Sequence, residues 1–160
     1  MRSLYFAVFL VLVLAGVGCT MHPMTYIEYR DQSTGVGFEI PTGATALSDG
    51  VNGFDAVWKF TYNGDSYMVQ FNEYRGDAIY ANWEMLTSDQ VTITKKGDRT
   101  IYTENGVART EVFMPENDPP ASIIVTKHEG TALMGEPSTS DDEVFQHLVS
   151  SVMIDQVAVF

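Results

Sequence analysis

The sequence DAVWKFTYNGDSYMVQFNEY, residues 55–74, carries the clearest local structural signal in the chain. Aromatic and apolar residues alternate with other residues on both sides of an Asn-Gly pair: Trp58, Phe60 and Tyr62 before it, and Tyr67, Val69 and Phe71 after it. Such alternation places one face of a strand in the core. Asn63-Gly64 accepts the positive φ values of a tight hairpin turn. The stretch therefore predicts an antiparallel hairpin with strands at 55–62 and 66–74.

Shorter apolar runs predict further strands on both sides of this hairpin. Residues 26–30 and 36–40 form a predicted pair, which ends at Pro41 because proline cannot donate to a ladder. Four more runs follow the hairpin, at 91–94, 100–103, 108–113 and 122–127. Lys95–Asp98 and Asn105-Gly106 have the residue types of the turns between them.

Two segments have helical spacing. Ile79, Trp83 and Leu86 predict a mid-chain helix over residues 77–86. Ser140 to Glu143 reads as a capping box that opens a C-terminal helix. That helix is expected to bury one apolar stripe: Val144, Phe145, Leu148, Val149 and Val152. Together these elements predict a single α+β domain over residues 26–160, an antiparallel sheet of about six to seven strands with two packed helices.

The N-terminal segment has the composition of an export signal. Arg2 precedes a run of fourteen apolar or small residues, Leu4 to Val17, and Cys19 follows directly. This run is shorter than the roughly twenty residues of a membrane-spanning helix. A basic start, an apolar run and small residues before a break are typical of a secretory signal peptide.

The residues before the cysteine resemble the lipobox of bacterial lipoproteins: Leu14-Ala15-Gly16-Val17-Gly18-Cys19. Gly16 departs from the leucine that usually stands there. The resemblance implies that residues 1–18 are removed, that Cys19 is joined to diacylglycerol, and that residues 19–25 form a tether. Thr20 is not the aspartate of an inner-membrane retention signal, which favours the outer membrane if the cell has one. An ordinary cleaved signal peptide and an uncleaved anchor are the alternatives.

The charge of the mature chain excludes some partners. The leader carries only Arg2, so removing it leaves 142 residues with eight basic and 21 acidic side chains, a net charge of −13. This charge opposes binding to nucleic acid and to anionic head groups. Lys95-Lys96 is the one basic cluster. Membrane attachment is therefore expected to come from the lipid on Cys19, which is also the only cysteine, so no disulfide is expected.

Two segments resemble the PsbP/Mog1/DcrB-like group. Thr34-Gly35-Val36-Gly37-Phe38-Glu39-Ile40-Pro41 is similar to its opening of glycine, apolar strand and proline, and residues 145–152 are similar to its closing helix. The likeness covers Tyr26 to about Ile154. It implies a protein that assists assembly or binds partner proteins, with no shared catalytic set.

Searches for catalytic and metal-binding motifs give no positive prediction. Met21-His22-Pro23-Met24 offers soft donors for copper(I), but on a tether without fixed geometry. Glu143 and His147 are spaced to pair on the last helix. Ser150 and Ser151 lie too close to His147 on the same helix to serve as its nucleophile, and no Gly-x-Ser-x-Gly elbow exists. We expect no catalytic residue, metal or cofactor.

Aromatic residues are concentrated between Trp58 and Trp83, where they are interpreted mainly as core. Tyr74 and Tyr80 are the candidates for a partner or ligand surface. The sequence thus favours a membrane-anchored envelope lipoprotein that binds or assembles with an envelope protein. An envelope enzyme with a spatially assembled site and a carrier of apolar ligands are the alternatives.

Overall fold

A large antiparallel sheet forms one layer of the fold. The computed structural model describes residues 23–52, 55–73, 87–117, 120–130, 138 and 142–155. Seven strands pair in the order β3-β4-β5-β9-β8-β7-β6, and every neighbouring pair is antiparallel. Their bounds are β3 (Thr45–Asn52), β4 (Asp55–Tyr62), β5 (Asp65–Glu73), β6 (Val91–Lys96), β7 (Arg99–Glu104), β8 (Arg109–Met114) and β9 (Ala121–His128).

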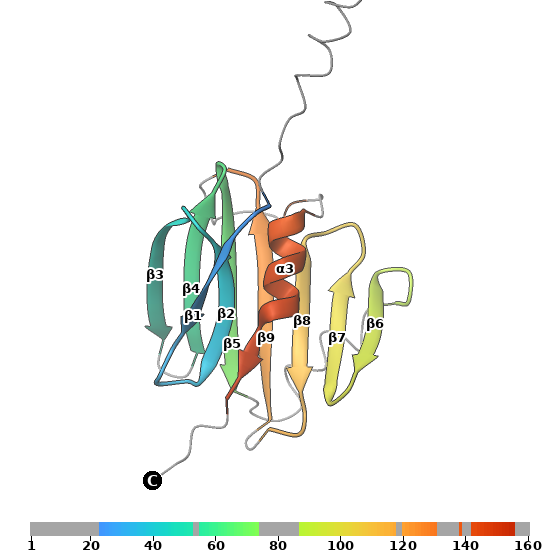
Figure 1. The fold of residues 1–160 in the computed structure, drawn as a ribbon. Helices are drawn as coiled ribbons and strands as arrows, with labels where there is room; N and C mark the ends of the chain where they lie inside the picture. Colours follow the sequence, from blue (N-terminus) through green and yellow to red (C-terminus); the bar gives the residue numbers. More distant parts are fainter. Residues whose placement is uncertain are drawn as a thin grey trace, which may run out of the picture.

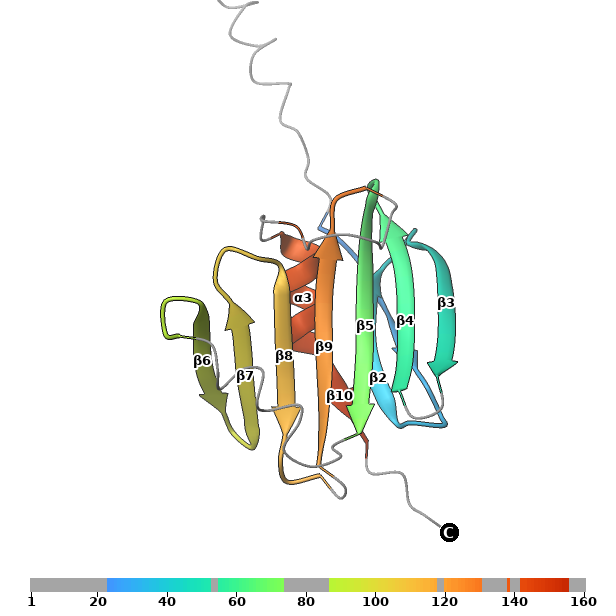
Figure 2. The ribbon, with the colours of Figure 1, turned by 180° about the vertical axis from the view of Figure 1, so that it is seen from behind.

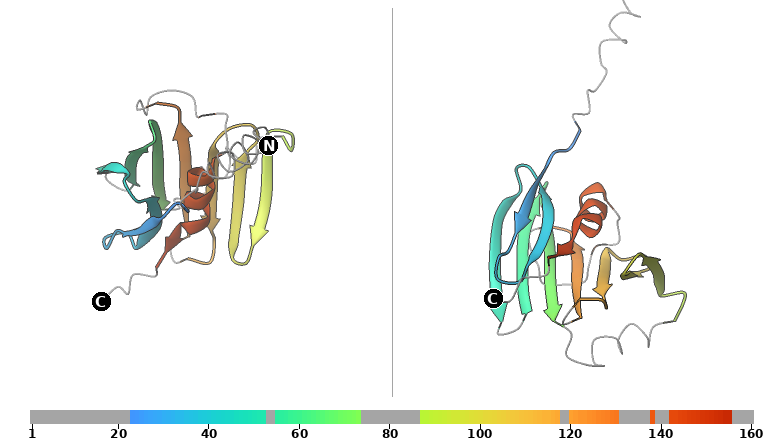
Figure 3. Two further views of the ribbon diagram at one scale, coloured as in Figure 1. Left: turned by 45° about the horizontal axis from the view of Figure 1, so that its top comes forward. Right: turned by 60° about the horizontal axis from the view of Figure 1, so that its bottom comes forward.

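A small sheet and a helix form the second layer. β1 (Tyr26–Arg30) and β10 (Met153–Ile154) flank β2 (Val36–Pro41), and α3 (Glu143–Ser151) runs directly into β10. These elements lie on one side of the large sheet, in front of it in Figure 1 and behind it in Figure 2. Figure 3 shows the same two layers from two further directions. The predicted α+β class and antiparallel sheet are therefore confirmed, with a second sheet that the sequence did not predict.

The hairpin of β4 and β5 has the predicted pairing. Trp58 lies opposite Val69 and Phe60 opposite Tyr67, so the alternating residues share one face. Asn63 and Gly64 have φ values of 52° and 90°, as the tight turn requires. The pairs 26–30 with 36–40 and β7 with β8 are likewise confirmed.

The hydrophobic core lies between the two layers. Its largest fully buried side chains come from both sheets and the helix: Trp58, Tyr67, Phe38, Phe60, Phe145, Ile123 and Leu148. Each such side chain stabilises the fold by about 1.5–3 kcal/mol through removal of its apolar surface from water. Gly37 fits the narrow space in β2 between its two partner strands, because a Cβ there would lie 3.1 Å from Cγ of Met153.

The closing helix begins later than predicted. Asp142 is its N-cap and accepts a hydrogen bond from the backbone N–H of Phe145 at 2.6 Å, so Glu143 is the first helical residue. The predicted Ser140–Glu143 capping box is therefore wrong, because the Asp142 carboxylate fills the capping role. Val144, Phe145 and Leu148 are buried as predicted, whereas Val152 follows the helix as its buried C-cap residue.

Two strands were missed, and one predicted helix lies outside the described residues. β3 has the sequence TALSDGVN, which lacks regular apolar alternation. β10 has only two residues and is defined by its pairing with β2. The predicted helix at 77–86 is not among the described residues, so α3 is the one helix in the described part of the chain.

Candidate functional site

An ionic cluster around a buried lysine joins the end of the central strand to the start of the helix. The side chain of Lys127, in β9, is only 5% exposed. Its Nζ lies 2.6 Å from Oδ2 of Asp142 and 3.2 Å from Oδ2 of Asp65, the first residue of β5. Tyr67 donates its hydroxyl hydrogen to Oδ2 of Asp142 at 2.9 Å. One carboxylate thus binds an ammonium, a phenol and a helix N–H.

The electrostatics of this cluster keep Lys127 and Asp142 charged and Tyr67 neutral. Burial raises the pKa of Tyr67, and the hydrogen bond to Asp142 raises it further. Burial alone would lower the pKa of Lys127, but the contacts with Asp142 and Asp65 outweigh it and the net direction is upward. Burial alone would raise the pKa of Asp142, yet its bonds with Lys127, Phe145 and Tyr67 hold that pKa below its ordinary value. The arrangement suits a structural clamp, since the ammonium of Lys127 binds both carboxylates, one from β5 and one from the start of α3.

A second cluster connects the helix to the small sheet. Nε2 of His147 lies 2.6 Å from Oε2 of Glu39 in β2. The Tyr26 ring stacks on the imidazole with centroids 3.5 Å apart and planes inclined by 14°. The pKa of Tyr26 is raised by burial and then by Glu143. His147 therefore pairs with Glu39 and not with Glu143, the partner that helix spacing suggested, because β2 packs against this face of α3.

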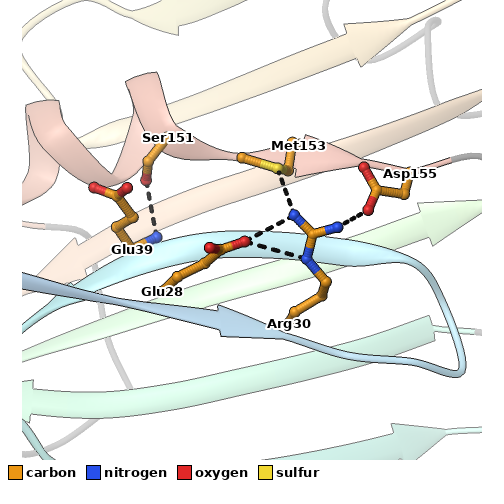
Figure 4. A network of polar contacts seen from close by, with 6 residues as sticks. All are labelled: Glu28, Arg30, Glu39, Ser151, Met153 and Asp155. Carbon is orange, nitrogen blue, oxygen red and sulfur yellow. Dashed lines mark hydrogen bonds and ion pairs between the residues drawn. The ribbon is translucent and has the colours of Figure 1, made fainter.

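Figure 4 shows a third polar network, which reaches from β1 across β2 to β10 and Asp155. Arg30 donates to Oε1 of Glu28 from Nη2 at 2.7 Å and from Nε at 3.1 Å, and its Nη1 pairs with Asp155. Arg30 Nη2 also contacts the sulfur of Met153 at 3.5 Å. Each of these exposed ion pairs is worth about 0–1 kcal/mol, so the network adds little to the stability of the fold.

The serines near His147 are engaged elsewhere. Ser150 donates its hydroxyl hydrogen to the backbone carbonyl of His147 at 2.8 Å, and Ser151 donates to that of Leu148 at 3.1 Å. Ser151 Oγ also accepts from the backbone N–H of Glu39 (Figure 4). The bond between Glu39 and Ser151 fastens α3 to β2, and the other two lie within the helix. All three bonds give the serines a structural role.

The predicted surface and lipid residues lie outside the described part of the chain. This holds for Tyr74, Tyr80 and Cys19. Of the other aromatic residues in the hairpin, Trp58, Phe60 and Tyr67 are fully buried, and Tyr62 and Phe71 pack against the core. The interpretation of this hairpin as core is confirmed. Within the described ranges, no three acidic, histidine or cysteine side chains are grouped for a metal ion, and no helix is long and apolar enough to span a membrane.

The sequence did not predict that strand β6 forms an exposed surface. β6 lies at the end of the large sheet, and all its residues after Val91 are exposed. Ile93 is 59% exposed, the highest value among the large hydrophobic side chains of the described residues. The available signal was the VTITKK sequence itself, an apolar residue next to the one basic pair in an acidic chain. Comparison of the chain with protein-family models, curated proteins and solved structures gave no match.

Proposed function

We propose that this chain is a lipoprotein of the bacterial cell envelope, anchored through acyl chains on Cys19, and that it acts by non-catalytic binding of an envelope protein. The observation that carries the anchor is the apolar run Leu4–Val17 followed directly by the only cysteine. Two or three acyl chains hold a protein stably on a membrane, whereas one does so only marginally. Thr20 favours the outer membrane if the cell has one.

The start of the folded domain supports a short tether. The backbone N–H of Thr42 donates to the carbonyl of Thr25 at 2.8 Å, and the hydroxyls of these residues also bond. Thr25 follows Cys19 by only six positions. At about 3.3–3.6 Å per extended residue, they span at most roughly 20 Å. An anchor at Cys19 would hold the domain within reach of proteins at the membrane surface.

The arrangement of elements supports a PsbP/Mog1/DcrB-like domain as the finer description. The glycine-containing strand β2 is buried and ends at Pro41, and the closing helix packs on it through Ser151 and His147. The charged and hydroxyl side chains of the three polar clusters are also bonded to one another in structural contacts. Both observations favour a binding or assembly role.

Mass spectrometry of the N-terminal peptide from the native host tests the anchor. The expected peptide begins at Cys19 and carries diacylglycerol, and a palmitate analogue fed to the cells should label the protein. The Cys19→Ser variant is the matched control, because it keeps the apolar run and removes the thiol. An unmodified Cys19, or an N-terminus at another residue, would contradict the anchor.

Crosslinking of the anchored protein in its own cells, followed by identification of co-purifying chains, tests the binding role. We expect one envelope protein to be recovered with the lipidated chain. The control is an unrelated lipoprotein expressed at the same level. Recovery of the same proteins with both baits would count against specific binding.

A further inference from the structure

The outer side of β6 is an open sheet edge from Thr92 to Lys96 in the described part of the chain, since the N–H of Val91 already donates to the carbonyl of Thr87 at 3.2 Å; we call these five residues the β6 edge. β7 pairs with one side of β6, and no other described strand pairs with the opposite side. An edge strand presents backbone donors and acceptors that another strand can satisfy. The five residues from Thr92 to Lys96 are exposed.

The register with β7 identifies which backbone groups point outward. The N–H of Asn105 donates to the carbonyl of Gln90 at 2.8 Å, which makes this pair a hydrogen-bonded one. Hydrogen-bonded and non-hydrogen-bonded pairs alternate along an antiparallel ladder. Ile93 and Lys95 therefore belong to non-hydrogen-bonded pairs with Tyr102 and Thr100. Their N–H and C=O groups point away from β7, toward the open side.

The side chains of Ile93 and Lys95 determine which partner residues would fit opposite them. Ile93 and Lys95 are two residues apart on a strand, so their side chains share one face. Within the described ranges, neither Lys95 nor Lys96 has a carboxylate in ion-pairing distance, although the chain carries a net charge of −12. An added antiparallel strand would place one residue opposite Lys95 and the residue two positions later opposite Ile93. An acidic residue opposite Lys95 and an apolar residue opposite Ile93 would match these two side chains best.

We propose that the β6 edge binds an extended acidic segment of a partner protein by strand addition, with an acidic side chain opposite Lys95 and an apolar one opposite Ile93. The inference rests on the proposed binding role and names its partner class. Lysines on an edge strand oppose pairing with basic or uncharged strands. A second copy of β6 would bring the lysines of two chains onto one short ladder without an acid between them. The charges therefore favour an acidic segment over self-association.

A pair of synthetic peptides tests the preference for an acidic residue opposite Lys95. The first is Val-Thr-Val-Thr-Glu-Thr-Val-Thr-Val with blocked ends, and the second has lysine in place of glutamate. The mature full chain, in detergent, should bind the glutamate peptide more tightly, by roughly tenfold, because attraction replaces repulsion. Lys95→Glu should invert the preference. Lys59→Glu on β4 is the matched charge control and should leave it unchanged.

Amide hydrogen exchange locates the peptide. Binding should slow exchange at Ile93 and Lys95 and leave the β3 edge at Thr45–Asn52 unaffected. Equal affinity for both peptides, protection elsewhere, or self-association through β6 that excludes the peptide would overturn the proposal. The Cys19→Ser chain should bind the peptides like the lipidated chain. Failure of the peptide test would therefore leave the anchor standing, and loss of the anchor would leave the peptide result standing.

Discussion

Lys127 of the central strand β9 contacts Asp142, the N-cap of α3, with 2.6 Å between Nζ and Oδ2. The other oxygen of the same carboxylate accepts the N–H of Phe145. The helix start is therefore fixed by a residue of the large sheet as well as by the local sequence. This contact explains why the helix begins at Glu143 and not at residue 141, where a Ser140 cap would have started it.

Removal of the buried ammonium should destabilise the fold. Lys127→Met is expected to lower the free energy of unfolding by about 3 kcal/mol, because it leaves the carboxylates of Asp142 and Asp65 without their cation. Urea denaturation of the variant measures the change. The matched control is Lys95→Met on the exposed edge, which should change stability by less than about 0.5 kcal/mol. Equal effects at the two lysines would contradict the clamp.

Acid should weaken the same cluster. The pKa of Asp142 is lower in the folded chain than its ordinary 3.8, so its stabilising contribution is present above that value and is lost as the pH falls through the folded pKa. The free energy of unfolding should therefore decrease as the pH falls below about 5. Asp142→Asn should show a shallower decrease over this range. The same slope in variant and parent would show that other carboxyls cause it.

Asp31 supplies an independent acid-sensitive group. Burial would raise its pKa, but hydrogen bonds from Ser33 and Thr34 outweigh burial and lower it. Asp31→Asn should also reduce the acid-dependent loss of stability in the same pH range, because the pKa of Asp31 is likewise lower in the folded chain. Because Asp31 lies in the β1–β2 turn, away from Asp142, the effects of the two substitutions should add. Marked non-additivity in denaturation measurements would argue against two separate sites.

His147 should hold the first strand to the helix. His147→Ala removes the stacking on Tyr26 and the contact with Glu39, at an expected cost of about 1 kcal/mol. Backbone amides of Ile27 to Arg30 should then exchange faster with solvent. Gln146→Ala changes an exposed neighbour on α3 and is the control. Unchanged exchange in β1 would mean that its pairing with β2 is sufficient by itself.

Glycine should be required at position 64 because of the positive φ there, and not because space is short. Its φ is 90°, and a Cβ at this position would meet no atom within 4 Å. Gly64→Ala is therefore expected to cost roughly 1–2 kcal/mol through backbone strain, without any steric clash. Asn63→Gly should have a smaller effect, because glycine accepts a positive φ. Thermal unfolding compares the two, and an unchanged midpoint for Gly64→Ala would disprove the strain argument.

Local patterns carried much of the strand prediction. The alternation in 55–74, the Asn63-Gly64 turn and the apolar stripe of α3 act between residues a few positions apart, so the sequence states them directly. The same reasoning failed for β3, whose sequence has no regular alternation, and for the helix start at Asp142. It also failed to give His147 its partner, since Glu39 is 108 residues away.

The sequence by itself determined the α+β class, the main hairpin, the closing helix and the expectation of a lipid on Cys19. Only the tertiary structure decided that β5 pairs with β9, that β1, β2 and β10 form a second sheet, and that β6 is left at an edge. Periodicity and turn chemistry are properties of neighbouring residues. Which strands become neighbours depends on how all the apolar faces are buried together, and no local segment encodes that choice.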